Sequence, residues 1–181
     1  MSNLSNQPLS PLDGRYQPAV AGLGEFLSEA GLNKARVHVE VEWLIHLANR
    51  NLLKNNAPLD LTEIERLRNV VTNFSDDDVA TLAKTEAVTK HDVKAVEYFV
   101  RAKLAEVGRE DLAELTHFAC TSEDINNLSY AITVRDSIQQ VWFPRAEGLL
   151  TKLRELSAKY SEVSMLSRTH GQPATPTTMG K

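Results

Sequence analysis

The sequence predicts an all-α fold, and two observations carry that prediction. Apolar residues recur at steps of three and four, the spacing of one face of an α-helix. Three stripes have this spacing: Val37, Val41, Leu44 and Ala48; Leu61, Ile64, Leu67 and Val71; and Val93, Val96, Val100 and Leu104. No segment keeps the two-residue alternation of a half-buried strand, and no Asn-Gly or Asp-Gly turn joins two such segments.

The longest predicted helix runs from Ser122 to about Tyr160. No glycine interrupts it before Gly148, and Pro144 is expected to kink or briefly interrupt it. A helix of about 38 residues is about 57 Å long, whereas a compact domain of this size is about 40 Å across. Its apolar stripe therefore needs partner helices, either later in the chain or in other subunits.

The last residues, QPATPTTMGK, predict a stiff loop followed by the start of a helix. Thr175 fits the N-cap and Pro176 the first helical position. Because only five residues follow Pro176, we expect the chain to be the amino-terminal fragment of a longer protein.

Composition narrows the class of function. Apolar residues make up 42% of the 181 and charged residues 24%, which is typical of a globular protein. Twenty basic residues against 24 acidic ones give a net charge of −4. Broad nucleic-acid binding is therefore not expected, although a local basic pocket for one small anion is compatible with this balance. The sequence has neither a signal peptide nor an apolar run long enough to span a membrane, so we expect a cytoplasmic protein without a membrane partner.

Cys120 is the only cysteine, which excludes an internal disulfide and a cysteine-rich zinc site. We expect it to be a small packed thiol rather than a nucleophile. The five histidines have no metal-binding spacing, and no glycine-rich phosphate loop is present. An enzyme with this sequence is expected to use acid–base chemistry on a small anion, with no metal and no cofactor.

Four short polar segments carry the candidate functional residues. In the first, Pro11 and the Asp13-Gly14 pair predict a turn that presents Arg15 and Tyr16 together. A guanidinium beside a phenol suits an anionic ligand that carries a ring. A turn with a solvated arginine explains the same residues.

The second segment, Lys90-His91-Asp92, precedes the stripe that begins at Val93. Asp92 is the expected N-cap, so Lys90 and His91 would lie just before the positive end of the helix, where an anion is stabilised. A capped helix with exposed polar neighbours is the alternative.

The third segment runs from His117 to Asp124 as HFACTSED. Thr121 and Asp124 approximate a capping box. The N–H groups of this helix start, with the hydroxyls of Thr121 and Ser122, are suited to hold a carboxylate. Capping alone explains the same residues without a ligand.

The fourth segment places His170 in a loop rich in glycine and proline, between Arg168 and Gln172. Loops on a rigid scaffold often carry function, and an imidazole both donates and accepts protons near neutral pH. A surface histidine is the alternative.

Taken in order, the four segments resemble the fumarase/aspartase superfamily and, within it, the adenylosuccinate lyase family. The matching stretches are SPLDGRY, KHDVKAVEYF, HFACTSEDINNLS and LSRTHGQPATP. The Thr-Ser-x-Asp and Thr-His-Gly-Gln-Pro pieces are shared across the superfamily, whereas DGRY and HDVKAVEYF point to the adenylosuccinate branch. The resemblance spans residues 10 to 181.

This resemblance implies an amino-terminal helical domain at residues 1–120 and, at 121–181, the beginning of the central helical bundle of a homotetramer. It implies elimination of fumarate from adenylosuccinate, which gives AMP, and from the succinylated imidazole-carboxamide ribotide of purine biosynthesis. The implied partner is a small-molecule nucleotide, without cofactor or nucleic acid.

The resemblance also implies a role for each matched residue. His170 matches the general acid. The residues expected to bind the substrate are Arg15, Tyr16, Lys90, His91, Asp92, His117, Thr121, Ser122 and Gln172. Among these, Arg15 and Tyr16 match nucleotide-binding positions, and Thr121 and Ser122 match the pair that holds the succinyl group. At Lys90 a backbone contact suffices.

The flexible signature loop of the family, which carries the serine taken as the general base, has no match in these 181 residues. We therefore expect the 181 residues alone to lack lyase activity. Two other interpretations stay open. One is another member of the superfamily, such as an argininosuccinate lyase or a fumarase. The other is a helical interaction module derived from a lyase scaffold.

Overall fold

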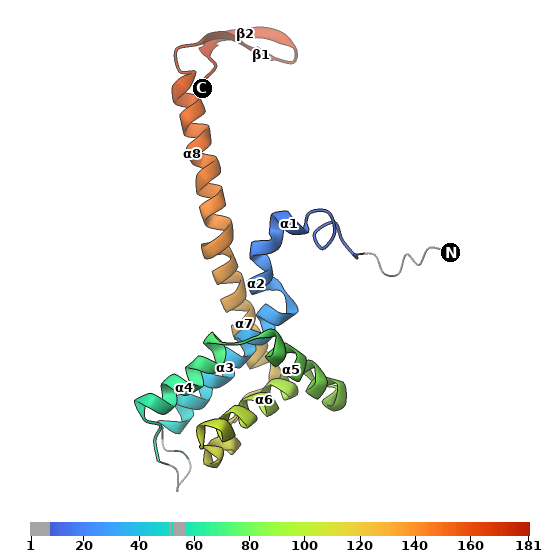
Figure 1. Ribbon diagram of the computed structural model, residues 1–181. Helices are drawn as coiled ribbons and strands as arrows, with labels where there is room; N and C mark the ends of the chain where they lie inside the picture. Colours follow the sequence, from blue (N-terminus) through green and yellow to red (C-terminus); the bar gives the residue numbers. More distant parts are fainter. Residues whose placement is uncertain (1–7, 51, 53–56) are drawn as a thin grey trace, which may run out of the picture. The chain divides into compact units, whose positions relative to one another are not determined.

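The computed structural model describes residues 8–50, 52 and 57–181. Its elements follow the chain in the order α1 (Gln17–Val20), η2 (Ala21–Leu23), α2 (Gly24–Leu27), α3 (Glu29–Ala48), α4 (Leu61–Thr72), α5 (Asp76–Thr89), α6 (Asp92–Val107), η3 (Glu110–Leu115), α7 (Ser122–Ser137), η4 (Ile138–Trp142), α8 (Phe143–Lys159), β1 (Ser164–Thr169) and β2 (Gln172–Thr178). Helices dominate the described chain (Figure 1), so the predicted all-α class is confirmed.

The chain divides into two compact units, Met1–Ser137 and Ile138–Lys181. We call them the first and the second unit. The division falls inside the long helical segment that follows Thr121. The domain boundary after residue 120 comes from the family resemblance and stays a prediction.

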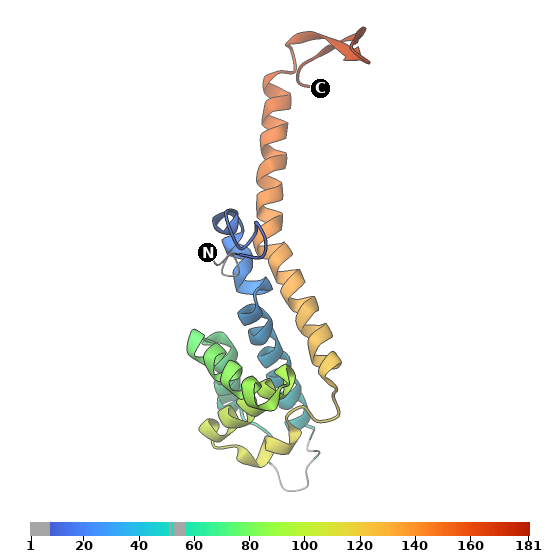
Figure 2. The same ribbon diagram turned by 90° about the vertical axis from the view of Figure 1, so that its right-hand side faces the viewer.

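Helix α3 is the centre of the first unit and packs against α4, α6 and α7. Figures 1 and 2 show α3 and α7 side by side in both views. The main core joins α3 to α4, α5, α6 and η3 through Val41, Leu67, Leu82, Val100 and Leu112. A smaller apolar cluster of Val39, Val93 and Ile125 joins α3 to the first turns of α6 and α7.

The predicted stripes form this core. All four residues of the α3 stripe and all four of the α6 stripe are buried. The α4 stripe is buried at Leu67 and half-buried at Ile64 and Val71, whereas Leu61 is 86% exposed. Leu61 is the first helical residue after the Asp60 N-cap, whereas Ile64, at the end of the same turn, packs against the core.

The segment from Ser122 to Lys159 is helical throughout, as predicted. Its middle turn, Ile138–Trp142, is a π-helix directly before Pro144. Proline has no N–H to donate to the carbonyl four residues earlier, and a π-turn is one way in which a helix accommodates such a loss. The predicted interruption near Pro144 is thus confirmed.

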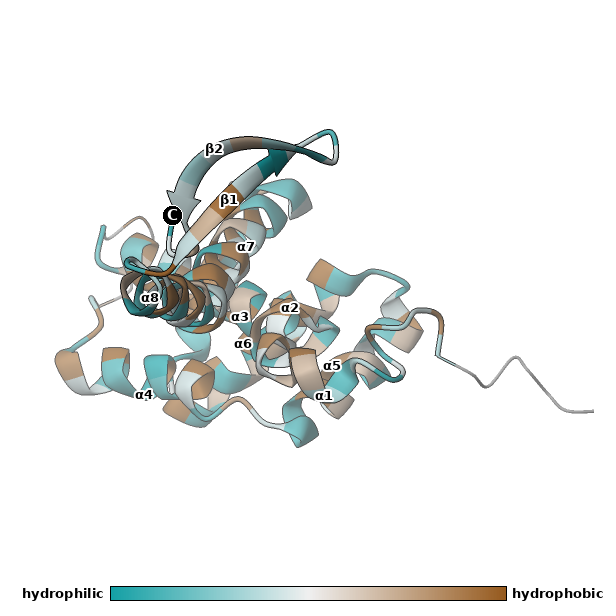
Figure 3. Cartoon of the chain, turned by 90° about the horizontal axis from the view of Figure 1, so that it is seen from above, coloured by the Kyte–Doolittle hydropathy of each residue, from teal (hydrophilic) through white to brown (hydrophobic). Residues whose placement is uncertain are grey.

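In the second unit, α8 carries an apolar stripe with little cover. Leu149, Leu150, Leu153 and Leu156 are between 39% and 62% exposed. Viewed along its axis in Figure 3, α8 carries both apolar (brown) and polar (teal) positions. No helix among the described residues is long and apolar enough to cross a membrane.

The predicted helix start at Thr175 and Pro176 is wrong: these residues lie in strand β2, which pairs antiparallel with β1. His170 (φ 50°) and Gly171 (φ 74°) form the two-residue turn between the strands. Positive φ at both central residues is typical of the type I′ turn that matches the twist of a hairpin. Both strands are edges, so the prolines at 173 and 176 cost the ladder little.

Candidate functional site

The second and third predicted segments meet where α6 and α7 begin. His91 precedes α6, Ser122 opens α7, and His91 Nε2 lies 3.4 Å from Ser122 Oγ. Beneath them, the cluster of Val39, Val93 and Ile125 packs both first turns against α3. Two helix N-termini, each with the partial positive charge of its helix dipole, therefore begin at neighbouring points.

His91, not Asp92, caps α6. Its Nδ1 accepts a hydrogen bond from the Lys94 N–H at 3.1 Å. This corrects the expected cap at Asp92, and the reason is that Asp92 has another partner. An accepting Nδ1 carries no proton, so in the neutral ring the proton is on Nε2, the nitrogen that faces Ser122.

Asp92 pairs with the buried Arg36 of α3, whose NH2 lies 2.6 Å from Asp92 Oδ2. The same guanidinium donates to Asn126 Oδ1 at 2.9 Å and to Asn33 Oδ1 at 3.0 Å. Burial opposes ionisation of Asp92, but the Val93 N–H and the Arg36 guanidinium outweigh it and lower the pKa of this carboxyl. Arg36 thus ties the starts of α6 and α7 to α3.

The loop that holds His117 is fixed by two other residues of α3. Glu40, which is fully buried, accepts from the His117 N–H at 3.1 Å and lies 2.5 Å from His117 Nδ1. Trp43 Nε1 donates to the Phe118 carbonyl at 2.9 Å. Burial raises the pKa of Glu40, against the opposing effect of His117.

Thr121 and Ser122 begin α7 as predicted. Asp124 Oδ2 accepts from the Thr121 N–H at 2.7 Å, which is the reciprocal half of a capping box. Cys120 is half-buried beside the small apolar cluster, and burial together with the charges of Glu40 and Asp124 raises the pKa of its thiol. A raised pKa disfavours the thiolate, in line with the packed thiol that we expected.

The first segment forms the predicted turn. The Gly14 N–H donates to the Ser10 carbonyl at 3.1 Å, and Asp13 accepts from both the N–H and the hydroxyl of Ser10. The Arg15 guanidinium stacks on the exposed Tyr16 ring, 4.6 Å from its centre. Within the described residues, no hydrogen bond or ion pair joins Arg15 or Tyr16 to the site around Ser122.

Lys90 ends α5 in a left-handed conformation, with φ 55°. Positive φ also occurs at His117 (61°), Ala119 (60°) and His170 (50°), and these are the non-glycine positions with this conformation in the described chain. All four lie within predicted functional segments. Left-handed backbone is unfavourable for residues with a Cβ and is concentrated at functional sites.

His170 and Gln172 lie in the second unit, His170 in the hairpin turn and Gln172 at the start of β2. Both are exposed. Ser167 braces the hairpin at its bulge, because its hydroxyl donates to the Thr175 carbonyl and accepts from the Thr175 N–H. That His170 meets the residues of the first unit stays a prediction.

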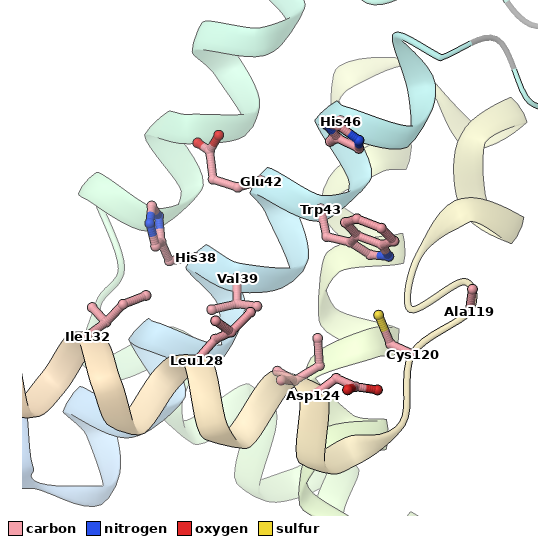
Figure 4. A pocket seen from close by; sticks show the side chains of 11 residues that line it. His38, Val39, Glu42, Trp43, His46, Ala119, Cys120, Asp124, Leu128 and Ile132 are labelled. Carbon is pink, nitrogen blue, oxygen red and sulfur yellow. The ribbon is translucent and has the colours of Figure 1, made fainter.

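A groove of about 580 Å³ lies beside the site, between α3 and α7. Figure 4 shows its walls: His38, Trp43 and His46 project from α3, Leu128 projects from α7, and Cys120 lies on the loop that precedes α7. The Trp43 and His46 rings are stacked, with their centres 5.5 Å apart. No cluster of three or more metal-ligating side chains occurs among the residues that the structure describes.

Comparison with known proteins identifies the family. Residues 14–181 match a family model described as a lyase. The chain belongs to this lyase family. Adenylosuccinate lyases are similar to it, with 45% identity over 174 residues for those of Escherichia coli (strain K12) and Haemophilus influenzae, and 40% over 177 residues for that of Dictyostelium discoideum. Each alignment covers 96% of this chain, and the chain spans 38% of the length of these relatives.

Solved structures support the same fold at lower identity. A fumarate lyase from Mesorhizobium sp. BNC1 matches with a TM-score of 0.64 at 18% identity, over 88% of this chain and 35% of its own. A beta-carboxy-cis,cis-muconate cycloisomerase from Acinetobacter calcoaceticus sp. ADP1 matches with a TM-score of 0.59 at 20% identity, over 88% and 36%. Both solved structures thus share the helical architecture described above.

Sequence reasoning missed Arg36, Glu40 and Trp43. They follow one another at steps of four and three, each one residue before a member of the α3 stripe. This spacing places them along the edge of the apolar face of the helix. A charged residue there is usually solvated, and only the burial of Arg36 and Glu40 reveals their roles.

Proposed function

We propose that the full-length protein containing this chain is an adenylosuccinate lyase. It would eliminate fumarate from adenylosuccinate to give AMP, and from the succinylated imidazole-carboxamide ribotide of purine biosynthesis. The observation that carries the proposal is the meeting of His91 and Ser122 at two helix starts, in a lyase-family chain with 40–45% identity to adenylosuccinate lyases.

Each carboxylate of a succinyl group needs hydrogen-bond donors. The N-terminus of α7, the Thr121 and Ser122 hydroxyls and His91 Nε2–H supply such donors within a few ångströms of one another. Removing the C–H next to a carboxylate builds negative charge on that group, and donors already aimed at it stabilise the transition state. His117 would contribute a ring nitrogen from the adjoining loop.

The nucleotide part would lie against the remaining residues. Arg15 and Tyr16 present a cation and an aromatic face that suit a phosphate and a ring. The left-handed Lys90 offers its backbone, Asp92 holds the α6 start through Arg36, and Gln172 borders the hairpin turn.

His170 would be the general acid that protonates the leaving nitrogen as the C–N bond breaks. In this proposal the general base comes from a loop outside the 181 residues, so these residues alone would not release fumarate. The exposed apolar stripe of α8 would be covered by other subunits in a homotetramer. The homotetramer and a cytoplasmic location both stay predictions.

A substrate panel tests the proposal. The full-length protein should release fumarate from adenylosuccinate, detected by its ultraviolet absorbance, and leave argininosuccinate and malate unchanged. Release of fumarate from argininosuccinate or from malate, in place of the adenylosuccinate reaction, would assign the protein to another branch. No reaction with any of the three would favour a helical interaction module.

A further inference from the structure

We infer that Glu40 positions His117 by holding one proton between its carboxylate and Nδ1, which makes Nε2 the ring nitrogen that exchanges a proton at the site. The inference rests on the proposed function only for the identity of the molecule that binds at Nε2. The state of the imidazole ring does not depend on that molecule.

Glu40 directs both of its oxygens at one residue. Oε1 lies 2.5 Å from His117 Nδ1, and Oε2 accepts from the His117 backbone N–H at 3.1 Å. In its ionised form the Glu40 carboxylate only accepts hydrogen bonds, so Nδ1 is then the donor. Nδ1 then keeps its proton when the ring is neutral, and Nε2 carries the lone pair. A proton that Nε2 takes from a ligand would leave an imidazolium paired with the Glu40 carboxylate.

The loop leaves the ring little freedom to choose another orientation. Glu40 fixes the backbone of His117, and Trp43, one turn further along α3, fixes the carbonyl of Phe118 at 2.9 Å. His117 and Ala119 both have positive φ, a conformation that persists where the surroundings impose it. The His117 side chain is 19% exposed, so it is not fully enclosed by the protein.

A purely structural role explains Glu40 poorly. Its carboxyl is fully buried, and the buried Glu97 of α6 adds a second negative charge nearby. Lys94 at 2.7 Å and Arg101 at 3.1 Å compensate Glu97, whereas the partner of Glu40 is His117. Burial and Glu97 both raise the pKa of Glu40, and Cys120 is a further titratable group in its field. Packing alone would favour an uncharged side chain at this position.

The test is the tautomer of His117, read from long-range ¹H–¹⁵N correlations of the ring in the ¹⁵N-labelled chain. With the ring neutral, the wild-type chain should show Nδ1–H. The variant Glu40→Gln should switch it to Nε2–H, because the amide oxygen takes the backbone N–H and the amide NH₂ then faces Nδ1. Glu42→Gln is the matched control, since Glu42 lies on the same helix and pairs with Arg68, and it should leave the tautomer unchanged.

A neutral wild-type ring protonated at Nε2 would overturn the inference without any variant, even if Glu40→Gln failed to fold. Retention of Nδ1–H in a folded Glu40→Gln chain, or loss of it in Glu42→Gln, would overturn it too. In the full-length protein, Glu40→Gln should lower kcat by about 10–100-fold, the size of effect known for carboxylates that orient metal-binding histidines. Wild-type protein that releases no fumarate would refute the proposed function and leave the tautomer result standing.

Discussion

Replacing Arg36 by Met removes the guanidinium that joins three helices and keeps most of the apolar stem. The change removes the pair with Asp92 and the hydrogen bonds to Asn33 and Asn126. Both asparagines are 8% exposed, so their amide oxygens stay buried without a donor, whereas Asp92, with a side chain that is 44% exposed, is rehydrated.

The expected loss in the free energy of unfolding follows from these exposures. Removing one partner of a fully buried ion pair costs about 3–5 kcal/mol, and the rehydration of Asp92 places this case at the lower end. Leaving each buried amide oxygen unsatisfied costs about 1 kcal/mol within that sum. We therefore expect Arg36→Met to lower the free energy of unfolding by about 3 kcal/mol.

Urea denaturation measures this loss. The chain has two tryptophans, so in a Trp142→Phe background the fluorescence of Trp43 reports on the first unit alone. With a slope of about 2 kcal/mol/M, the midpoint should fall by about 1.5 M at unchanged slope. Arg135→Met is the control, because the Arg135 side chain is 58% exposed and its ion pair among the described residues is with the neighbouring Asp136. It should change stability by less than about 0.5 kcal/mol. Equal midpoints for Arg36→Met and the control would refute the role of the buried guanidinium.

Four further predictions concern single positions. Gly171→Ala places a Cβ on a residue with φ 74°, which destabilises the hairpin turn by about 1–2 kcal/mol. Cross-strand NOEs of the hairpin should therefore weaken, and undiminished NOEs would exclude the turn described above. Gly148→Ala meets nothing within 4 Å in a helix and should raise the melting temperature, since alanine is better there by about 0.5–1 kcal/mol; a lower melting temperature would contradict it. Gly180→Ala would bring a Cβ within 2.2 Å of the Ser157 carbonyl oxygen, so the last residues should detach from α8. Their amide protons should then exchange faster with solvent, and continued protection of these amides would disprove this contact. Because the pKa of Asp92 is lowered by folding, its contribution to stability is complete above its ordinary pKa of about 3.9 and lost as the pH falls through the lower folded-state value. The stability difference between wild type and Asp92→Asn should therefore be largest at neutral pH and shrink as the pH falls through that lower folded-state value. A pH-independent difference would show that the charge is not its source.

The sequence was sufficient for α3, α4, α6 and the long helical segment after Thr121, because their periodicity is a property of each segment alone. The stripes at Val37 and Val93 marked the core, and Pro144 marked the π-turn. The turn at Arg15 and the start of α7 at Ser122 followed equally from local residue types.

The rest depended on contacts between distant segments. The hairpin was missed because a His-Gly pair, with a histidine at positive φ, replaces the usual Asn-Gly signal. The cap of α6 was assigned to Asp92 because the sequence does not show that Arg36, 56 residues away, engages this carboxylate and leaves the cap to His91. Burial of Glu40 likewise becomes apparent only when the His117 loop closes over α3.

The most direct measurement uses the full-length protein with His170 replaced by Gln, assayed for both fumarate release and nucleotide binding. If His170 protonates the leaving nitrogen while the helix starts around Ser122 hold the substrate, turnover should fall by about 10²–10⁴-fold and the Kd for adenylosuccinate should stay near that of wild type. Wild-type turnover in the His170→Gln protein would contradict the assignment of the acid. A Kd weakened as strongly as turnover would contradict the separation of binding from proton transfer.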